Sequence, residues 1–262
     1  MIIRPFNLPF IILLLIFAGV FAFLTVLARK RGVDYARKLL GWVSAAFVPV
    51  FVVHVVSSIM DPVLNAVRAD NGLLPYTIWS VLPFHLCYVN MLMMPVAVFS
   101  GNRHLEHFCA MTGPAGALAA LCFPTVGYSD ANVFAASIMT YYILHFGLIA
   151  CGISIFTFRL VRPTYRDIPW SLLILVIAGV TAHIVNLILR QTGLYINANF
   201  CFTMTPEQIP PLEMVYSIIP VPLLYMAVAG TVLFSAYMFP LTAIVNAVSK
   251  RRHSTDDGGG QK

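Results

Sequence analysis

The feature that most constrains this chain is a series of long apolar runs separated by short polar segments. A run such as Leu8–Ala28 has about the 20 apolar residues that cross a bilayer as a helix. The composition agrees, since 60% of the residues are hydrophobic and 10% are charged, whereas soluble domains have roughly 25% charged residues. The sequence therefore predicts an all-α polytopic membrane helix bundle.

The apolar runs predict about seven transmembrane helices. They are expected over residues 8–28, 40–60, 79–100, 104–124, 133–159, 170–191 and 214–240. In the last of these, Pro220, Pro222 and Pro240 predict a kink, because proline lacks the backbone N–H that a helix uses. We expect a single bundle domain over residues 1–248 and a disordered cytoplasmic tail over 249–262.

The basic residues sort to one side of the predicted membrane. With seven helices, 13 of the 16 Lys and Arg residues fall in the loops after helices one, three and five and in the tail. The other side has Arg4, Arg68 and Arg190. Because basic residues collect on the cytoplasmic side, the N-terminus is predicted outside and the C-terminus inside, in a multi-pass protein of the cell membrane. The basic residues are therefore expected to set the orientation of the chain in the membrane, and no nucleic-acid partner is expected.

Polar residues from four predicted helices reach a similar depth. Counted from the helix ends, Cys87, His145, His54 and His183 lie between the midplane and the outer third of the bilayer. Asn186 follows His183 by one turn. An ionisable residue inside a membrane is by default a candidate for function. A single intramembrane histidine can also be an interhelical hydrogen-bonding residue, and His54 and His183 taken singly fit either interpretation.

Cys87 and His145 form a candidate nucleophile and base. A thiol in an apolar environment needs a partner that accepts its proton, and imidazole can do so and later protonate a leaving group. Asn90 is a candidate donor to an oxyanion, and His85, two residues from Cys87, is a candidate for orienting a neighbour. The remaining cysteines, Cys109, Cys122, Cys151 and Cys201, are expected to be packing residues.

Two other functions remain open from the residues alone. His54, His85, His145 and His183 beside Asp61 would suit a seven-helix zinc hydrolase, although no pair of histidines is spaced four apart. The same polar cluster would suit a small-molecule transporter, in which Cys87→Ser would be tolerated because no thiolate is needed. Catalysis by Cys87 and His145 as nucleophile and base would require no metal and no cofactor.

Several motifs occur in an order that carries a family resemblance. They are "LPFHLC", "YYILHFGL", "RPTYRDI", "HIVNLILRQTG" and "NANFCFTMTP", within about residues 75–240. In this respect the chain resembles the YwaF-type integral membrane proteins, a family that includes the animal acyltransferase transmembrane protein 164.

The resemblance implies a bundle of six or seven helices and an acyltransferase. It implies transfer of an acyl chain from a diacyl phospholipid to a lysophospholipid, with Cys87 and His145 as the catalytic cysteine and histidine. Other residues match motif positions and would be structural or position the substrate: His85, Arg162, Pro163, Asp167, Asn186 and Asn199. The implied partners are phospholipid and lysolipid substrates in the bilayer.

Overall fold

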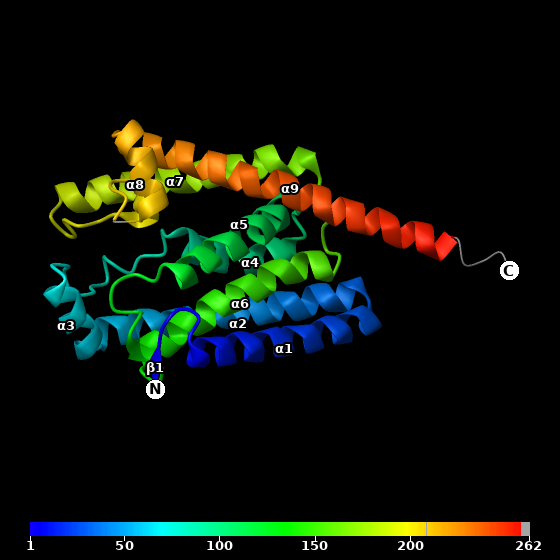
Figure 1. Ribbon diagram of the computed structural model, residues 1–262, viewed down its shortest axis with the longest axis horizontal. Coiled ribbons are helices and arrows are strands. Elements are labelled where there is room, and N and C mark those ends of the chain that lie inside the picture. Colours follow the sequence, from blue (N-terminus) through cyan, green and yellow to red (C-terminus); the bar gives the residue numbers. More distant parts are fainter. Residues whose placement is uncertain (208, 258–262) are drawn as a thin grey trace.

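The computed structural model describes residues 1–207 and 209–257 of the chain, and most of them lie in helices (Figure 1). The helices are α1 (Leu8–Arg31), α2 (Val33–Met60), α3 (Pro62–Asp70), α4 (Leu86–Ser100), α5 (Arg103–Cys122), α6 (Ala136–Thr157), α7 (Ile168–Gln191), α8 (Pro210–Ile218) and α9 (Leu224–Asp257). Two short strands, β1 (Ile2–Ile3) and β2 (Ala131–Asn132), pair antiparallel and join the N-terminus to the loop before α6.

The helices confirm the prediction of an all-α polytopic bundle. Five of them, α1, α2, α6, α7 and α9, are long and apolar enough to cross a membrane, and α4 is a shorter apolar helix. With α5, these seven correspond in order to the seven predicted segments. Residues 249–257 of the predicted tail continue α9, while residues 258–262 lie outside the described part of the chain.

Two helices differ from the prediction in where they begin or in whether they are continuous. The third was predicted from residue 79, but α4 begins at Leu86, after a non-helical approach that contains Pro83. Proline disfavours helical backbone in the residue before it. The last predicted helix is divided at Pro220 and Pro222 into α8 and α9, and Leu223 has a left-handed backbone with φ of 62°. At Pro220 and Pro222 the expected kink is therefore a complete break, whereas α9 continues through Pro240.

The long helices form three layers (Figure 1). The pair α4 and α5 lies in the middle, with α1, α2 and α6 on one side and α7, α8 and α9 on the other. The most extensive packing joins α5 to α6 and α2 to both α6 and α4, whereas α7 packs chiefly against α9 and α5. The side made of α7–α9 is therefore attached to the rest mainly through α5.

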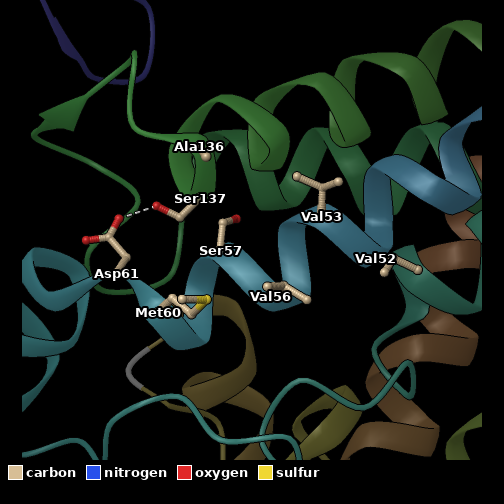
Figure 2. Close-up of a pocket in the computed structure, with 8 residues that line it drawn as sticks. All are labelled: Val52, Val53, Val56, Ser57, Met60, Asp61, Ala136 and Ser137. Carbon is tan, nitrogen blue, oxygen red and sulfur yellow. Dashed lines mark hydrogen bonds between the residues drawn. The ribbon is translucent and has the colours of Figure 1, made fainter.

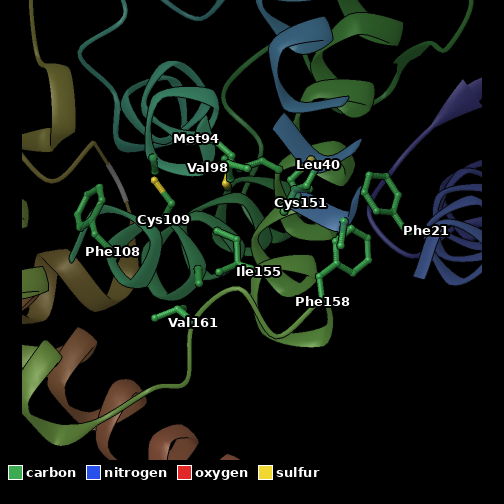
Figure 3. Packing of buried hydrophobic residues seen from close by; sticks show 14 of the residues in the cluster. Phe21, Leu40, Met94, Val98, Phe108, Cys109, Cys151, Ile155, Phe158 and Val161 are labelled. Carbon is green, nitrogen blue, oxygen red and sulfur yellow. The ribbon is translucent and has the colours of Figure 1, made fainter. Parts of the chain in front are cut away.

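A tightly packed core fixes α2, α4, α5 and α6 against each other (Figure 3). Cys109 and Cys151 are fully buried in it, which agrees with their expected role as packing residues. Gly152 of α6 lies so close to α5 that an added Cβ would stand 2.6 Å from Pro114 Cγ. This close approach of the α6 backbone to the Pro114 ring holds α5 and α6 together.

At the end of the bundle rich in basic residues, an ion pair joins α5 to the start of α7. Arg103 donates from Nε and Nη2 to the two carboxylate oxygens of Asp167, at 2.9 and 2.7 Å. Asp167 also accepts from the backbone N–H and hydroxyl of Thr164, which closes a capping box over a short 3₁₀ turn. These contacts support a structural role for the matching "RPTYRDI" segment.

Candidate functional site

A cavity of about 670 Å³ lies where α4, α5 and α6 face α7 and α9. Its size is that of a typical small-molecule site. Most of its lining is apolar, and the polar side chains include His54, His85, Cys87, His145 and Cys201. Four residues that the sequence placed at a similar depth or in one motif therefore share one cavity, and Cys201 joins them.

Cys87 lies in the first turn of α4, because that helix begins at Leu86. The first backbone N–H groups of a helix have no partner within the helix, and the helix dipole is positive there. Such an end stabilises a thiolate and can donate hydrogen bonds to an oxyanion. The late start of α4 therefore places Cys87 among backbone N–H groups that have no partner within the helix, which a continuous helix from residue 79 would not do.

His145 of α6 is held in one orientation by Tyr141, one turn earlier. Its Nδ1 lies 2.7 Å from the Tyr141 carbonyl oxygen, and the two rings are 4.2 Å apart. A carbonyl only accepts hydrogen bonds, so Nδ1 carries the proton and Nε2 of the neutral ring keeps its lone pair. Tyr141 in turn stacks on Tyr128 at 4.3 Å. His145 is thus a fixed imidazole with a basic nitrogen available.

His54 of α2 has both ring nitrogens engaged. Nδ1 lies 3.2 Å from the Ser137 carbonyl oxygen and 3.1 Å from Thr140 Oγ1, and Nε2 lies 3.0 Å from the Tyr88 hydroxyl. Because the carbonyl requires a proton on Nδ1, Nε2 accepts from Tyr88. His54 is therefore suited to fix Tyr88 beside Cys87, and Tyr88 is a cavity residue that the sequence analysis did not single out.

His85 is the residue immediately before α4, and its ring is surrounded by aromatic side chains. Phe200 and Phe202 lie 5.3 and 5.7 Å from it, centroid to centroid, and Tyr88 lies 6.3 Å away. The segment after α7 and the start of α4 thus meet at this ring. His85 lines the cavity beside Cys87 and is placed to position what enters there.

Cys201 was expected to be a packing residue, but it lines the cavity and its thiol contacts the approach to α4. Its Sγ donates to the Phe84 carbonyl oxygen at 3.0 Å, and Cys201 and Cys87 line the same cavity. Both Cys201 and Phe202 have left-handed backbones, with φ of 52° and 56°, which is unfavourable for residues other than glycine. The only sequence signal for Cys201 was its place inside the "NANFCFTMTP" motif.

Asn186 of α7 holds this strained segment in place. Its side chain donates to the Phe200 carbonyl oxygen and to Thr203 Oγ1 at 3.1 and 2.9 Å, and accepts from the Phe200 N–H at 2.8 Å. His183, one turn earlier, lies 3.2 Å from the same Thr203 hydroxyl. Thr203 lines the cavity. His183 is therefore connected to the cavity through the Thr203 hydroxyl.

Asn90 and Asn199 are engaged in structural hydrogen bonds. Asn90 is fully buried, donates to the Leu86 carbonyl oxygen at 2.9 Å and accepts from Thr112 Oγ1 at 2.9 Å. Asn90 thus ties α4 to α5 about one turn after Cys87. Because the Asn90 amide is engaged in these bonds, the backbone N–H groups at the start of α4 are the better candidates for donors to an oxyanion. Asn199 organises the next loop by donating to Thr205 and Glu207 and accepting from the Met204 N–H.

Asp61 lines a second, open hollow on α2, which none of the histidines lines (Figure 2). It caps α3 by accepting from the Val63 and Leu64 N–H groups, and it also accepts from Ser137 Oγ. Among the described side chains, those of residues 1–207 and 209–247, no three His, Cys, Asp or Glu are grouped so that they could hold a metal ion. The zinc-hydrolase alternative gains no support from this arrangement.

Comparison with protein families relates the chain to a known family. The model of the TMEM164 family matches residues 4–246, which is nearly the whole chain. No curated protein and no solved structure matches it.

Proposed function

The chain belongs to the TMEM164 family, and on this premise we propose that it is a phospholipid acyltransferase of the cell membrane, with Cys87 as nucleophile and His145 as base. One observation carries the proposal. A thiol at a helix start and an imidazole with an available basic nitrogen, on two different helices, line the same largely apolar cavity.

In the first step, His145 Nε2 takes the proton of the Cys87 thiol, and the thiolate attacks the ester carbonyl of a diacyl phospholipid. The backbone N–H groups at the start of α4 are suited to stabilise the oxyanion. The C–O bond of the ester breaks, and His145 gives its proton to the departing lysophospholipid oxygen. The enzyme then carries the acyl group as a thioester on Cys87.

In the second step, the hydroxyl of an acceptor lysophospholipid attacks the thioester. His145 takes the hydroxyl proton, the C–S bond breaks, and the proton returns to the Cys87 thiolate. The apolar lining favours lipid substrates and limits water. Where water enters in place of the lysolipid, the same residues would release a free fatty acid.

The test incubates purified protein with a diacyl phospholipid and measures an acyl adduct on Cys87 by mass spectrometry. Adding a lysophospholipid should discharge the adduct and yield a new diacyl lipid. Cys87→Ala should abolish both signals and His145→Gln should strongly reduce them, whereas Cys109→Ala, a change in the packed core, should keep them.

Three outcomes would redirect the proposal. Product at the wild-type level from Cys87→Ala would rule out catalysis by this thiol. Absence of both adduct and product from the folded wild type would favour the transporter alternative. Free fatty acid in place of remodelled lipid, with an intact adduct on Cys87, would identify a hydrolase that uses the same pair.

A further inference from the structure

The cavity continues well beyond Cys87 and His145, between α7 and α9. On α9 its lining recurs at helical spacing on one face, through Met226, Ala227, Gly230, Thr231, Leu233, Phe234 and Tyr237. From Leu224 to Tyr237 this face is about 20 Å long at 1.5 Å per residue. On α7 the opposite wall is formed by Leu175, Val176, Ala178, Gly179 and Val180. We refer to this part of the cavity as the α7–α9 limb.

One end of the limb packs against the protein core, and the lining of the limb is largely apolar. At its inner end, Phe234 and Tyr237 pack against a buried cluster that contains Met111 and Ile168. At the other end, Cys87 and His145 line the same cavity. A space of this kind suits a long apolar group whose reactive end lies at the thiol.

We propose that the α7–α9 limb holds one acyl chain of the donor phospholipid, with the ester carbonyl at Cys87 and the chain end near Tyr237. The inference rests on the proposed acyltransferase function and adds a determinant of chain length. A bilayer has a hydrocarbon core about 30 Å thick, so one acyl chain covers about 15 Å of it. The length of the limb is comparable.

Two glycines keep the limb open. No atom of a neighbouring residue lies within 4 Å of the place where a Cβ on Gly179 would stand, and for Gly230 the nearest atom is Leu175 Cδ2 at 3.8 Å. A side chain at Gly179 would therefore begin in open space at the wall of the limb. Gly179 and Gly230 thus determine how much of an acyl chain the limb accepts.

The first experiment compares the wild type with Gly179→Leu on diacyl phospholipids of increasing chain length, by the rate of adduct formation on Cys87. The variant should retain short chains and lose long ones, by about fourfold for each methylene that no longer enters the limb. Gly19→Leu is the matched control, because Gly19 of α1 is exposed and its Cβ would also meet no atom within 4 Å. An unchanged chain-length profile in folded Gly179→Leu would overturn the proposal.

The second experiment does not depend on catalysis. A phosphatidylcholine with a photoreactive diazirine at the end of one acyl chain is crosslinked to the wild type and to Cys87→Ala, and the labelled residues are mapped by mass spectrometry. Label should appear on the inner part of the limb, at Leu175, Phe234 or Tyr237, and should fall in Gly179→Leu but not in Gly19→Leu.

The two experiments separate the two proposals. Label in the limb without any adduct on Cys87 would support the acyl-chain site and contradict thiol catalysis. An adduct on Cys87 with label confined to lipid-facing residues, equal in all variants, would support catalysis and overturn the acyl-chain site.

Discussion

Tyr141 and His145 are joined twice, since the Tyr141 carbonyl oxygen accepts from His145 Nδ1 at 2.7 Å and the two rings lie 4.2 Å apart. The carbonyl bond sets the tautomer, and the ring contact limits rotation of the imidazole. Tyr141 also donates from its hydroxyl to the Ala120 carbonyl oxygen of α5 at 2.7 Å. Tyr141 is therefore a positioning residue for His145.

Tyr141→Leu should slow adduct formation on Cys87 by about ten- to a hundredfold, because a small misplacement of a catalytic group has effects of this size. Tyr141→Phe keeps the ring and should stay within about threefold of the wild type, although losing one hydrogen bond should cost about 1 kcal/mol of stability. The check is the single-turnover rate together with thermal unfolding. Equal rates for the two variants would contradict the positioning role.

Asn186→Ala should destabilise the segment that carries Cys201. It leaves the Phe200 N–H and carbonyl without their side-chain partner, and the expected loss is about 1–3 kcal/mol. Released from its strained backbone, Cys201 should also react faster with a maleimide. Thr181→Ala is the control, because Thr181 is exposed on the same helix and bonds within it. Unchanged Cys201 reactivity would show that Asn186 does not hold this segment.

Two alanine substitutions should move stability in opposite directions. Gly152→Ala would place a methyl group 2.6 Å from Pro114, and overpacking of this kind typically costs about 1–3 kcal/mol. Gly179→Ala meets no neighbouring atom within 4 Å and should stabilise α7 by up to about 1 kcal/mol, because alanine favours a helix over glycine. Thermal unfolding of the two purified variants in one detergent measures the difference. A higher unfolding temperature for Gly152→Ala would contradict the close approach of α5 and α6.

Arg103→Ala should lower the yield of folded protein without changing the activity of what survives. Asp167 has a side chain only 3% exposed and would lose its charged partner, at an expected cost of about 1–3 kcal/mol. Arg166→Ala, an exposed neighbour of Asp167, is the control and should behave as the wild type. The measurements are yield and activity per folded molecule. Loss of turnover in well-folded Arg103→Ala would assign this end of the bundle a part in catalysis.

The orientation in the membrane is also testable. A fluorescent reporter fused after Lys262 should be active on the cytoplasmic side, because 13 of the 16 basic residues lie on that side of the predicted topology. A periplasmic or extracellular reporter fused at the same position should be inactive. The reverse pattern would overturn the predicted topology, although the helix bundle itself would stand.

The sequence by itself determined the class of fold and most of the helices, because a run of apolar residues long enough to cross a bilayer predicts a membrane helix without any tertiary information. It also led to Cys87 and His145, since polar residues in hydrocarbon stand out from their neighbours. It placed the start of the third long helix too early, because hydropathy does not register the local backbone restriction at Pro83.

Only the tertiary structure decided how these residues are used. It separated His54, whose ring nitrogens are both engaged, from His145, whose Nε2 remains available, because hydrogen-bond partners come from other helices. It also brought Cys201, distant along the chain, beside the start of α4. Contacts of this kind depend on how the helices pack, and local sequence patterns do not predict them. For this reason Cys201 was expected to be a packing residue, although it lines the cavity with Cys87.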